Sequence, residues 1–207
     1  MTNDTKIKNV CIFSSSSNNL AEVYYEAARQ LGILLAQAGF NIVYGGGNLG
    51  TMLENAKAVK EFGGKVTGVM PEKLYEAGLG NINCDEFHVT KCMRTRKEKL
   101  DKISDAVIAL AGGFGTLEEL MEMIVQKQLG YNTKAIVILN TAGFYNNLVN
   151  FFNEMIEQKF AGPESKELCY VAQTPQDAVN YLINYQPKHF DIYEKLNLEN
   201  KQKVQNI

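Results

Sequence analysis

The fold of this chain is decided by the stretch Ala106-Val107-Ile108-Ala109-Leu110-Ala111-Gly112-Gly113-Phe114-Gly115-Thr116-Leu117-Glu118-Glu119. Its first five residues form an apolar run typical of a buried strand, and apolar residues recur at helical spacing from Leu117 onward. The glycines between them therefore form a turn from a strand into a helix. Glycines let a ligand approach the backbone, and the free amides of a helix's first turn attract anions. We expect an anion to bind here, beside the carboxylates of Glu118 and Glu119.

Strand and helix patterns alternate along the rest of the chain. Strand-like apolar runs occur at four further places, which are residues 9–13, 41–44, 65–70 and 135–139. The last of these runs is apolar throughout, which is typical of a strand buried on both faces of a parallel sheet. The alternation predicts an α/β fold with a doubly wound, mostly parallel sheet and helices on both faces. We expect one domain over residues 1–186, followed by a polar tail over residues 187–207.

Composition excludes several classes of function. The chain has 207 residues and a net charge of −2, so it lacks the basic field that nucleic acids and anionic membranes require. No apolar run approaches membrane-spanning length, and residues 1–6 lack the apolar core of a signal peptide. We therefore expect a cytoplasmic protein that binds neither nucleic acid nor membranes.

The cysteines and histidines do not form a recognisable catalytic or metal-binding pattern. The four cysteines include no C-x-x-C pair, and Cys11 lies within a strand-like run, so we interpret them as buried, reduced thiols. No serine or cysteine lies in a nucleophile-elbow context, so a histidine-dependent triad is poorly supported. His88 is interpreted as an ordinary strand residue, and we expect no metal site.

A second glycine-rich turn, Gly45-Gly46-Gly47-Asn48-Leu49-Gly50, follows the second predicted strand. It spells G-x-G-x-x-G, and Glu72 lies far enough downstream to bind a ribose, so a dinucleotide site stays possible. It is not a P-loop, because Thr51-Met52 stand where that motif needs a lysine and a hydroxyl. Residues 72–85 show weak periodicity, and we expect a mobile flap there. The serines after the first strand, Ser15 among them, either cap the next helix or contact a phosphate or a base.

A pair of cations, Arg96 and Lys97, precedes the central strand. Thr95 and Glu98 match a capping box, which would place both cations in the first turn of a helix. Cations there are unfavourable by roughly 0.3–1 kcal/mol each. A bound phosphate or carboxylate would remove this conflict, and so would side chains that bend into solvent.

These elements are expected to meet at one crevice. Ligands of open parallel sheets bind at the carboxyl ends of the strands, where both glycine turns lie. The crevice is then lined by Gly45–Asn48, Gly112–Thr116, Arg96, Lys97 and Glu119. Amides and cations on one side and carboxylates on the other suit a sugar phosphate.

Glu119 suits the cleavage of an N-glycosidic bond. Positive charge develops on the sugar as this bond breaks, so a fixed carboxylate stabilises the transition state more than the ground state. We expect Glu119 to stay ionised near a helix N-terminus. The spacing Thr116-x-x-Glu119 also matches a capping box, in which Glu119 would only satisfy its own helix.

Several motifs together resemble the LOG family of cytokinin riboside 5′-monophosphate phosphoribohydrolases, many of which carry the label "possible lysine decarboxylase". They are Met93-Arg94-Thr95-Arg96-Lys97, Ser104-Asp105 and Gly112–Glu119, with Gly45-Gly46-Gly47 upstream. The resemblance extends from about Val10 to Ala172. It implies a homodimeric, Rossmann-like enzyme that hydrolyses a nucleoside 5′-monophosphate to free base and ribose 5-phosphate. We expect the substrate to be a purine nucleotide, plain or N6-substituted.

The resemblance implies that Arg96 and Glu119 are catalytic. Substrate binding is expected at Ser15, Gly45, Gly46, Gly47, Asn48, Lys97, Gly112, Gly113, Gly115, Thr116 and Glu118. No metal or other cofactor is expected, and no lysine lies in a motif for the Schiff base that a pyridoxal-phosphate decarboxylase needs. The chain departs from the family pattern in having Ala111 for proline, Thr51 for leucine and Ser15 for glycine.

Two other functions remain open from the sequence. The first is a non-catalytic nucleotide sensor or carrier on the same fold, similar to molybdenum cofactor carriers, in which Glu119 is only a helix cap. The second is a dinucleotide-dependent oxidoreductase that uses Gly45–Gly50 and Glu72. The second is weakened because its glycine fingerprint follows the second strand rather than the first.

Overall fold

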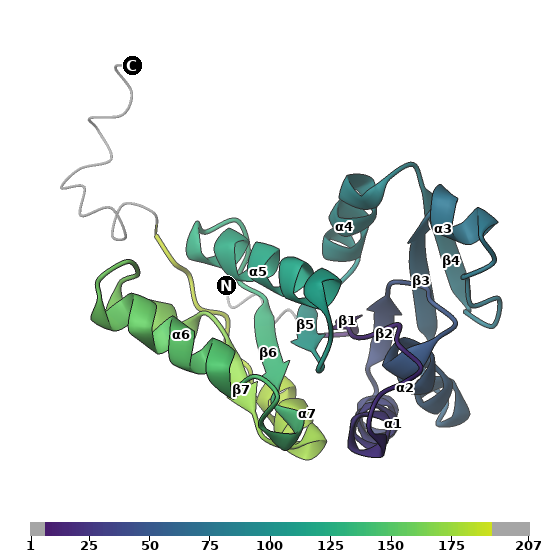
Figure 1. The fold of residues 1–207 in the computed structure, drawn as a ribbon, viewed down its shortest axis with the longest axis horizontal. Helices are drawn as coiled ribbons and strands as arrows, with labels where there is room; N and C mark the ends of the chain where they lie inside the picture. Colours follow the sequence, from purple (N-terminus) through teal and green to yellow (C-terminus); the bar gives the residue numbers. More distant parts are fainter. Residues whose placement is uncertain (1–6, 192–207) are drawn as a thin grey trace, which may run out of the picture.

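The computed structural model describes residues 7–191 of the chain. They form a seven-stranded sheet in the order β4-β3-β2-β1-β5-β6-β7 (Figure 1). The strands are β1 Asn9–Phe13, β2 Asn41–Tyr44, β3 Val66–Pro71, β4 Glu86–Thr90, β5 Ala106–Ala109, β6 Ala135–Leu139 and β7 Tyr170–Ala172. The helices are α1 Glu22–Gln37, α2 Gly50–Glu61, α3 Glu72–Glu76, α4 Met93–Lys102, α5 Phe114–Gln128, α6 Asn146–Glu157 and α7 Pro175–Ile183, with short 3-10 turns at Thr141–Gly143 and Pro163–Glu167. Residues 192–207 of the predicted polar tail lie outside the described residues.

All six strand pairings are parallel, which confirms the predicted α/β, doubly wound fold. β1 lies between β2 and β5, with Val10 opposite Ile42 on one side and Ala106 on the other. The chain proceeds from β1 outward to β4 and then returns to the other side of β1 for β5. This reversal of direction makes the carboxyl ends of β1 and β5 the expected place for a ligand.

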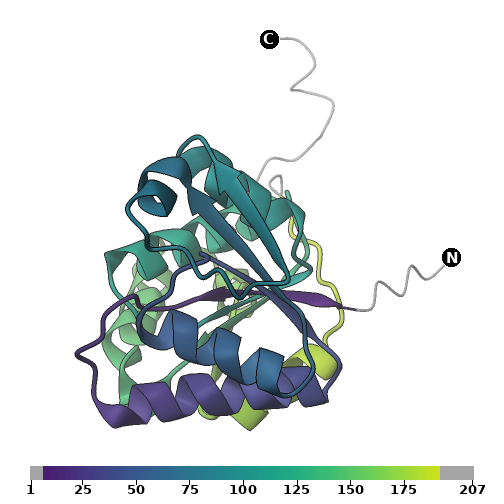
Figure 2. The same ribbon diagram turned by 90° about the vertical axis from the view of Figure 1, so that its right-hand side faces the viewer.

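Helices cover both faces of the sheet and bury two apolar clusters. One cluster joins Val10 and Ile12 of β1 to residues of α1, α2 and α7. The other joins Cys11 and Phe13 to residues of α4 and α5. Side chains alternate in this way because successive residues of a strand point to opposite faces. Figure 2 shows α1 and α2 side by side beneath the sheet. The four cysteines are free thiols, and Cys11 is buried as predicted. Cys84 and Cys169 are half-buried and Cys92 is exposed, so the prediction of buried thiols is wrong for Cys92.

Several local predictions need correction. α4 begins at Met93, because the Cys92 amide donates to Thr95 Oγ1 at 3.2 Å, so Thr95 lies inside the helix and is not its N-cap. Arg96 and Lys97 are therefore the fourth and fifth residues of the helix, farther from its N-terminus than expected, so the predicted conflict with its dipole is weaker. The expected flap at residues 72–85 contains α3, and its Gly80 pairs with Gly47 in an antiparallel bridge.

Other boundaries agree with the sequence patterns. Gly39 ends α1 in the left-handed conformation, and Thr174 caps α7 by accepting a hydrogen bond from the Asp177 amide. Within residues 7–191, the helices are all too short or too polar to cross a membrane.

Candidate functional site

A cleft of about 290 Å³ opens at the carboxyl ends of the central strands. Its position at the β1–β5 reversal is the one expected for a ligand site in this class of fold. The residues that line it are Ile12, Ser14, Ser16, Gly45, Gly47, Asn48, Leu49, Met52, Met70, Leu74, Leu79, Met93, Arg96, Gly115, Thr116 and Glu119. The cleft thus combines a polar end, a buried ion pair and an apolar side.

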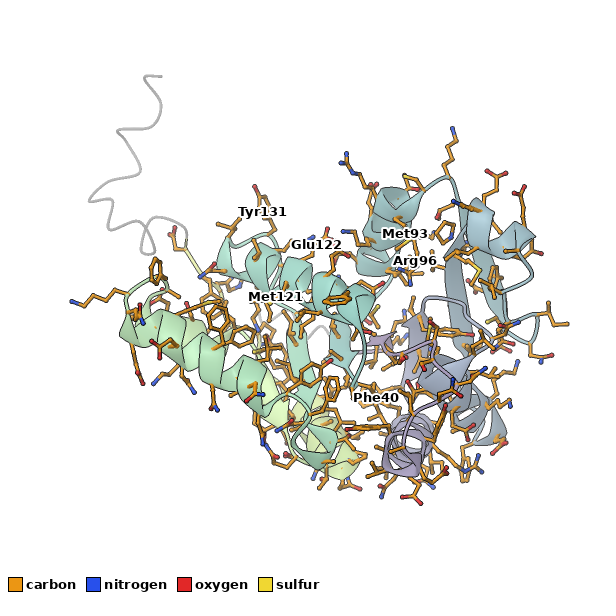
Figure 3. All side chains as sticks on the ribbon, in the orientation of Figure 1. Phe40, Met93, Arg96, Met121, Glu122 and Tyr131 are labelled. Carbon is orange, nitrogen blue, oxygen red and sulfur yellow. The ribbon has the colours of Figure 1, made fainter. Side chains whose placement is uncertain are left out.

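The buried ion pair joins α4 to α5. Arg96 Nη1 donates to Glu119 Oε1 at 2.5 Å, and Arg96 Nε donates to the Val69 carbonyl at 3.1 Å. The two residues are 7% and 8% exposed, so little water screens the interaction. Figure 3 shows Arg96 and Met93 between α4 and β3. The position beside this ion pair requires a glycine, because a Cβ on Gly45 would overlap Arg96 Nη2.

Two opposing effects set the charge state of Glu119. Burial raises the pKa of this carboxyl above its ordinary value of 4.5, and the Arg96 guanidinium opposes the rise. From the sequence, we expected the N-terminus of the helix to keep Glu119 ionised. Glu119 is instead the sixth residue of α5, and its hydrogen-bond partner is Arg96. The capping-box interpretation is therefore wrong, since Gly113 is the N-cap and Thr116 Oγ1 donates to the Ser14 carbonyl at 3.0 Å.

The glycine turn before α5 presents free amides at the polar end of the cleft. α5 begins at Phe114, so the amides of Phe114, Gly115 and Thr116 have no carbonyl partner within the helix. No acceptor for them exists among residues 7–191. Gly112 packs against Thr116 so closely that a Cβ would overlap its side chain. This turn is shaped to receive an acceptor-rich group such as a phosphate.

The other glycine turn differs, because the protein itself fills the N-terminus of α2. The Gly50 amide donates to Asn18 Oδ1 at 2.8 Å, and the Met52 amide donates to the Ser15 carbonyl at 3.2 Å. Thr51 Oγ1 accepts a hydrogen bond from the Ser15 amide. The serine loop after β1 is thus tied to α2, and the Gly45–Asn48 turn borders the cleft without offering it a free helix end.

The predicted site residues divide into two groups. Those that line the cleft are Gly45, Gly47, Asn48, Arg96, Gly115, Thr116 and Glu119, and those that do not are Ser15, Gly46, Lys97, Gly112, Gly113 and Glu118. Lys97 forms ion pairs with Glu118 and Glu122 instead. Gly112 and Gly113 do not line the cleft themselves, but they shape the turn that leads into α5.

Sequence reasoning missed part of the lining. Ser14 and Ser16 line the cleft where Ser15 was expected, whereas the backbone of Ser15 bonds to α2. It also missed the apolar side, to which Leu74, Leu79 and Met93 belong. Apolar residues of this kind give no signal in a sequence that separates them from the core.

Comparisons with known proteins agree with this geometry. The family model described as "Possible lysine decarboxylase" matches residues 52–182. A probable cytokinin riboside 5′-monophosphate phosphoribohydrolase of Oryza sativa subsp. japonica is 35% identical over 202 residues, covering 98% of this chain and 83% of the relative. An Arabidopsis thaliana enzyme named for the same activity is 37% identical over 192 residues, covering 93% and 89%. The chain belongs to the LOG family.

Solved structures share the fold. A molybdenum cofactor carrier protein of Chlamydomonas reinhardtii has a TM-score of 0.65 and 25% identity, covering 85% of this chain and 96% of its own. The molybdenum cofactor binding protein of Rippkaea orientalis also has a TM-score of 0.65, at 22% identity over 86% of this chain and 96% of its own. The second likeness shows the Rossmann-like fold alone.

The decarboxylase description of the family model does not suit the cleft of this LOG family member. Pyridoxal-phosphate chemistry needs a lysine amine that forms a Schiff base with the cofactor. Among the described residues, the lining of the cleft includes no lysine. Lys97, next to the catalytic candidate Arg96, is held by two carboxylates outside it.

Proposed function

We propose that this LOG family protein hydrolyses the N-glycosidic bond of a purine nucleoside 5′-monophosphate, plain or N6-substituted. The products are the free base and ribose 5-phosphate. The names of its relatives support this activity. The observation that carries the proposal is the buried Arg96–Glu119 pair, which lies in one cleft with the free amides before α5.

The phosphate is assigned to the polar end of the cleft. The amides of Gly115 and Thr116 would bind its oxygens, with Gly112 and Gly113 shaping the turn. Gly45, Gly47 and Asn48 would border the ribose and base. Ser15, Gly46, Lys97 and Glu118 would support these groups from outside the lining, in contrast to the direct contacts that the sequence suggested.

Glu119 is assigned the stabilisation of the transition state. As the bond from C1′ to the base nitrogen breaks, the ribose ring becomes positive, and a carboxylate already fixed by Arg96 stabilises it without reorganisation. A water molecule adds its oxygen to C1′ and loses a proton, and the departing base gains one. Glu119 is also assigned the acceptance of the proton of that water, which would orient the attack.

Arg96 is assigned two tasks. It holds the Glu119 carboxylate in place through Nη1, and the bond from Nε to the Val69 carbonyl fixes the guanidinium plane. Its remaining Nη2 group lies beside Gly45 at the edge of the cleft. There it would donate to the substrate and assist the departure of the base.

The test is incubation with AMP, an N6-alkylated AMP, GMP and CMP, with free base and ribose 5-phosphate measured by chromatography. We expect release from the adenine nucleotides and none from CMP. Substitution of Glu119→Gln should abolish release while nucleotide binding persists. The proposal is rejected if no monophosphate yields ribose 5-phosphate.

A second candidate is a non-catalytic nucleotide or cofactor carrier, because the Chlamydomonas reinhardtii carrier protein shares the fold. The same assay separates the two. Tight binding of a nucleotide or a pterin cofactor without release of base would favour the carrier.

We also propose that the protein is a cytoplasmic homodimer. Free thiols at Cys11, Cys84, Cys92 and Cys169 suit a reducing compartment. The amphipathic helix α6 buries none of its residues fully, and Phe151 on it is 55% exposed, so an apolar surface is available for a second copy. Light scattering coupled to size-exclusion chromatography would give a mass near 46 kDa, about twice the 23.1 kDa of the chain.

A further inference from the structure

The apolar side of the cleft includes a segment that lies outside the sheet. Residues 74–81, which we call the wall segment, comprise the end of α3 and the first part of the loop that leads to β4, and they contribute Leu74 and Leu79 to the lining. Two backbone hydrogen bonds tie this segment to the Gly45–Asn48 turn. The Asn48 amide donates to the Leu79 carbonyl at 3.0 Å and the Asn81 amide donates to the Gly46 carbonyl at 2.8 Å, and together these bonds form the antiparallel bridge between Gly47 and Gly80.

A buried hydroxyl lies at the centre of these contacts. Tyr44, the last residue of β2, is 1% exposed, and its hydroxyl donates to the Gly47 carbonyl at 3.2 Å. The same hydroxyl accepts a hydrogen bond from Asn81 Nδ2 at 2.9 Å, and Asn81 is 5% exposed. Burial raises the pKa of Tyr44 far above its ordinary value, so the hydroxyl keeps the proton that it donates. One side chain thus binds both the glycine turn and the wall segment.

The order of the strands indicates which part of a nucleotide meets the wall segment. The Gly112–Thr116 turn, to which the phosphate is assigned, follows β5, whereas the wall segment follows β3. The strands β1 and β2 lie between β5 and β3 in the sheet. Three strand spacings amount to about 14 Å, which is the scale of an extended nucleoside monophosphate. The end of the substrate farthest from its phosphate is the base.

The chemistry of the wall agrees with this placement. Leu74 and Leu79 face a cleft that Met52, Met70 and Met93 also line. Leucine and thioether side chains contact the faces of flat rings and alkyl groups well, and they offer no partner to a phosphate or a sugar hydroxyl.

We propose that Tyr44 and Asn81 are positioning residues that hold the wall segment against the base of the substrate. This inference rests on the proposed function. Neither residue touches the substrate. Their hydrogen bond fixes Leu79 relative to the glycine turn, and so sets how tightly the base is bound while the catalytic pair is unaffected.

The experiment measures binding apart from turnover. In a Glu119→Gln background, calorimetry gives dissociation constants for AMP, for an N6-alkylated AMP and for ribose 5-phosphate, which lacks a base. Tyr44→Phe removes only the hydroxyl, and with it the hydrogen bonds to Asn81 Nδ2 and the Gly47 carbonyl and the contact with Cys84 Sγ at 3.6 Å. We expect this variant to weaken the binding of both nucleotides by about 10-fold and the binding of ribose 5-phosphate by less than about 2-fold. With Glu119 intact, KM should rise while kcat changes little.

Two further variants keep the test decisive. Asn81→Ala breaks the same hydrogen bond from the other side and should reproduce the effect, which matters if Tyr44→Phe fails to fold. Tyr170→Phe removes a hydroxyl that donates to Asp177 at 2.9 Å on the far edge of the sheet, and it should change none of the constants.

The outcomes separate this inference from the proposed function. The positioning role would be overturned if the binding of nucleotides and the binding of ribose 5-phosphate were weakened equally. A fall in kcat with an unchanged KM would also overturn it. Hydrolysis that fails in the wild type while nucleotide binding still depends on Tyr44 would reject the activity and leave the positioning role standing. If the wild type binds no nucleotide at all, both are rejected.

Discussion

Arg96 on α4 and Glu119 on α5 are 23 residues apart in the chain, and their side chains meet at 2.5 Å in the lining of the cleft. Each is buried, so each depends on the other for compensation of its charge. The strand β5 and its glycine turn connect the two helices. The same turn that presents amides to a phosphate therefore also sets the distance between the two catalytic candidates.

Loss of the charge on Glu119 should abolish most catalysis. Glu119→Gln keeps the shape of the side chain but removes the carboxylate that faces the developing positive charge on the ribose. We expect kcat to fall by about 100- to 1000-fold, with KM changed by less than roughly 3-fold. Base release under saturating nucleotide is the measurement, and circular dichroism checks that the fold is retained. A variant with nearly full kcat would show that Glu119 is only structural.

The absence of a side chain at Gly45 should matter as much for catalysis as the charge of Arg96 does. Gly45→Ala places a methyl group on Arg96 Nη2 and displaces the guanidinium. We expect kcat to fall by about 100-fold, because small misplacements of a catalytic group are costly. The matched variant is Gly47→Ala in the same turn, whose methyl group would meet only the flexible end of Met52, at 3.2 Å. It should lose less activity than Gly45→Ala, and equal losses would argue against the displacement of Arg96.

Activity should decline on the acid side, with a midpoint above pH 4.5. Burial raises the pKa of Glu119 above that ordinary value, and only the ionised form stabilises the transition state. The native state then binds this proton more tightly than the unfolded state does, so protonation of Glu119 favours folding as the pH falls. The loss of kcat/KM should therefore precede any acid unfolding. A profile of kcat/KM against pH, compared with unfolding curves at the same pH values, checks this order.

The sequence was sufficient for the class of fold, a doubly wound parallel sheet, and for the two glycine turns. Apolar runs such as Ala135–Leu139 and the turn at Gly112–Thr116 are local patterns, and local patterns can be read without the fold. The start of α4 was misplaced for a local reason as well. Thr95 and Glu98 imitate a capping box, whereas the N-cap of the helix is Cys92, a residue type seldom associated with N-caps.

The wall segment could not be predicted, because its contacts are not local. Leu79 is held by the amide of Asn48, and Asn81 by the hydroxyl of Tyr44, across separations of 31 and 37 residues. Such pairings leave no periodicity in the sequence. Ser14 rather than Ser15 lines the cleft, and the contacts that hold Ser15 are likewise distant in the chain, because its amide and carbonyl bond to Thr51 and Met52 of α2.

A buried lysine outside the cleft should lower the stability of the protein at neutral pH. Lys127 of α5 is 1% exposed, and no carboxylate among residues 7–191 forms an ion pair with it. Its Nζ donates to the Tyr185 hydroxyl at 3.1 Å and lies 5.9 Å from the centre of the Phe190 ring. Burial lowers the pKa of Lys127 from 10.5 to about 8. A depression of this size corresponds to about 3 kcal/mol of unfavourable burial of the charged amine.

Lys127→Met should therefore raise the free energy of unfolding at pH 7 by about 2 kcal/mol, because the lost hydrogen bond to Tyr185 offsets part of the gain. Below pH 8 the amine is charged in both states and the full cost applies. Between pH 8 and 10.5 the unfolded state binds the extra proton, so the wild type gains stability as the pH rises, and the variant lacks this gain. Urea unfolding of both proteins at pH 7 and pH 9.5 measures the difference, which should shrink at the higher pH. A variant less stable than the wild type at pH 7 would mean that the contacts of the amine with Tyr185 and Phe190 outweigh the cost of its burial.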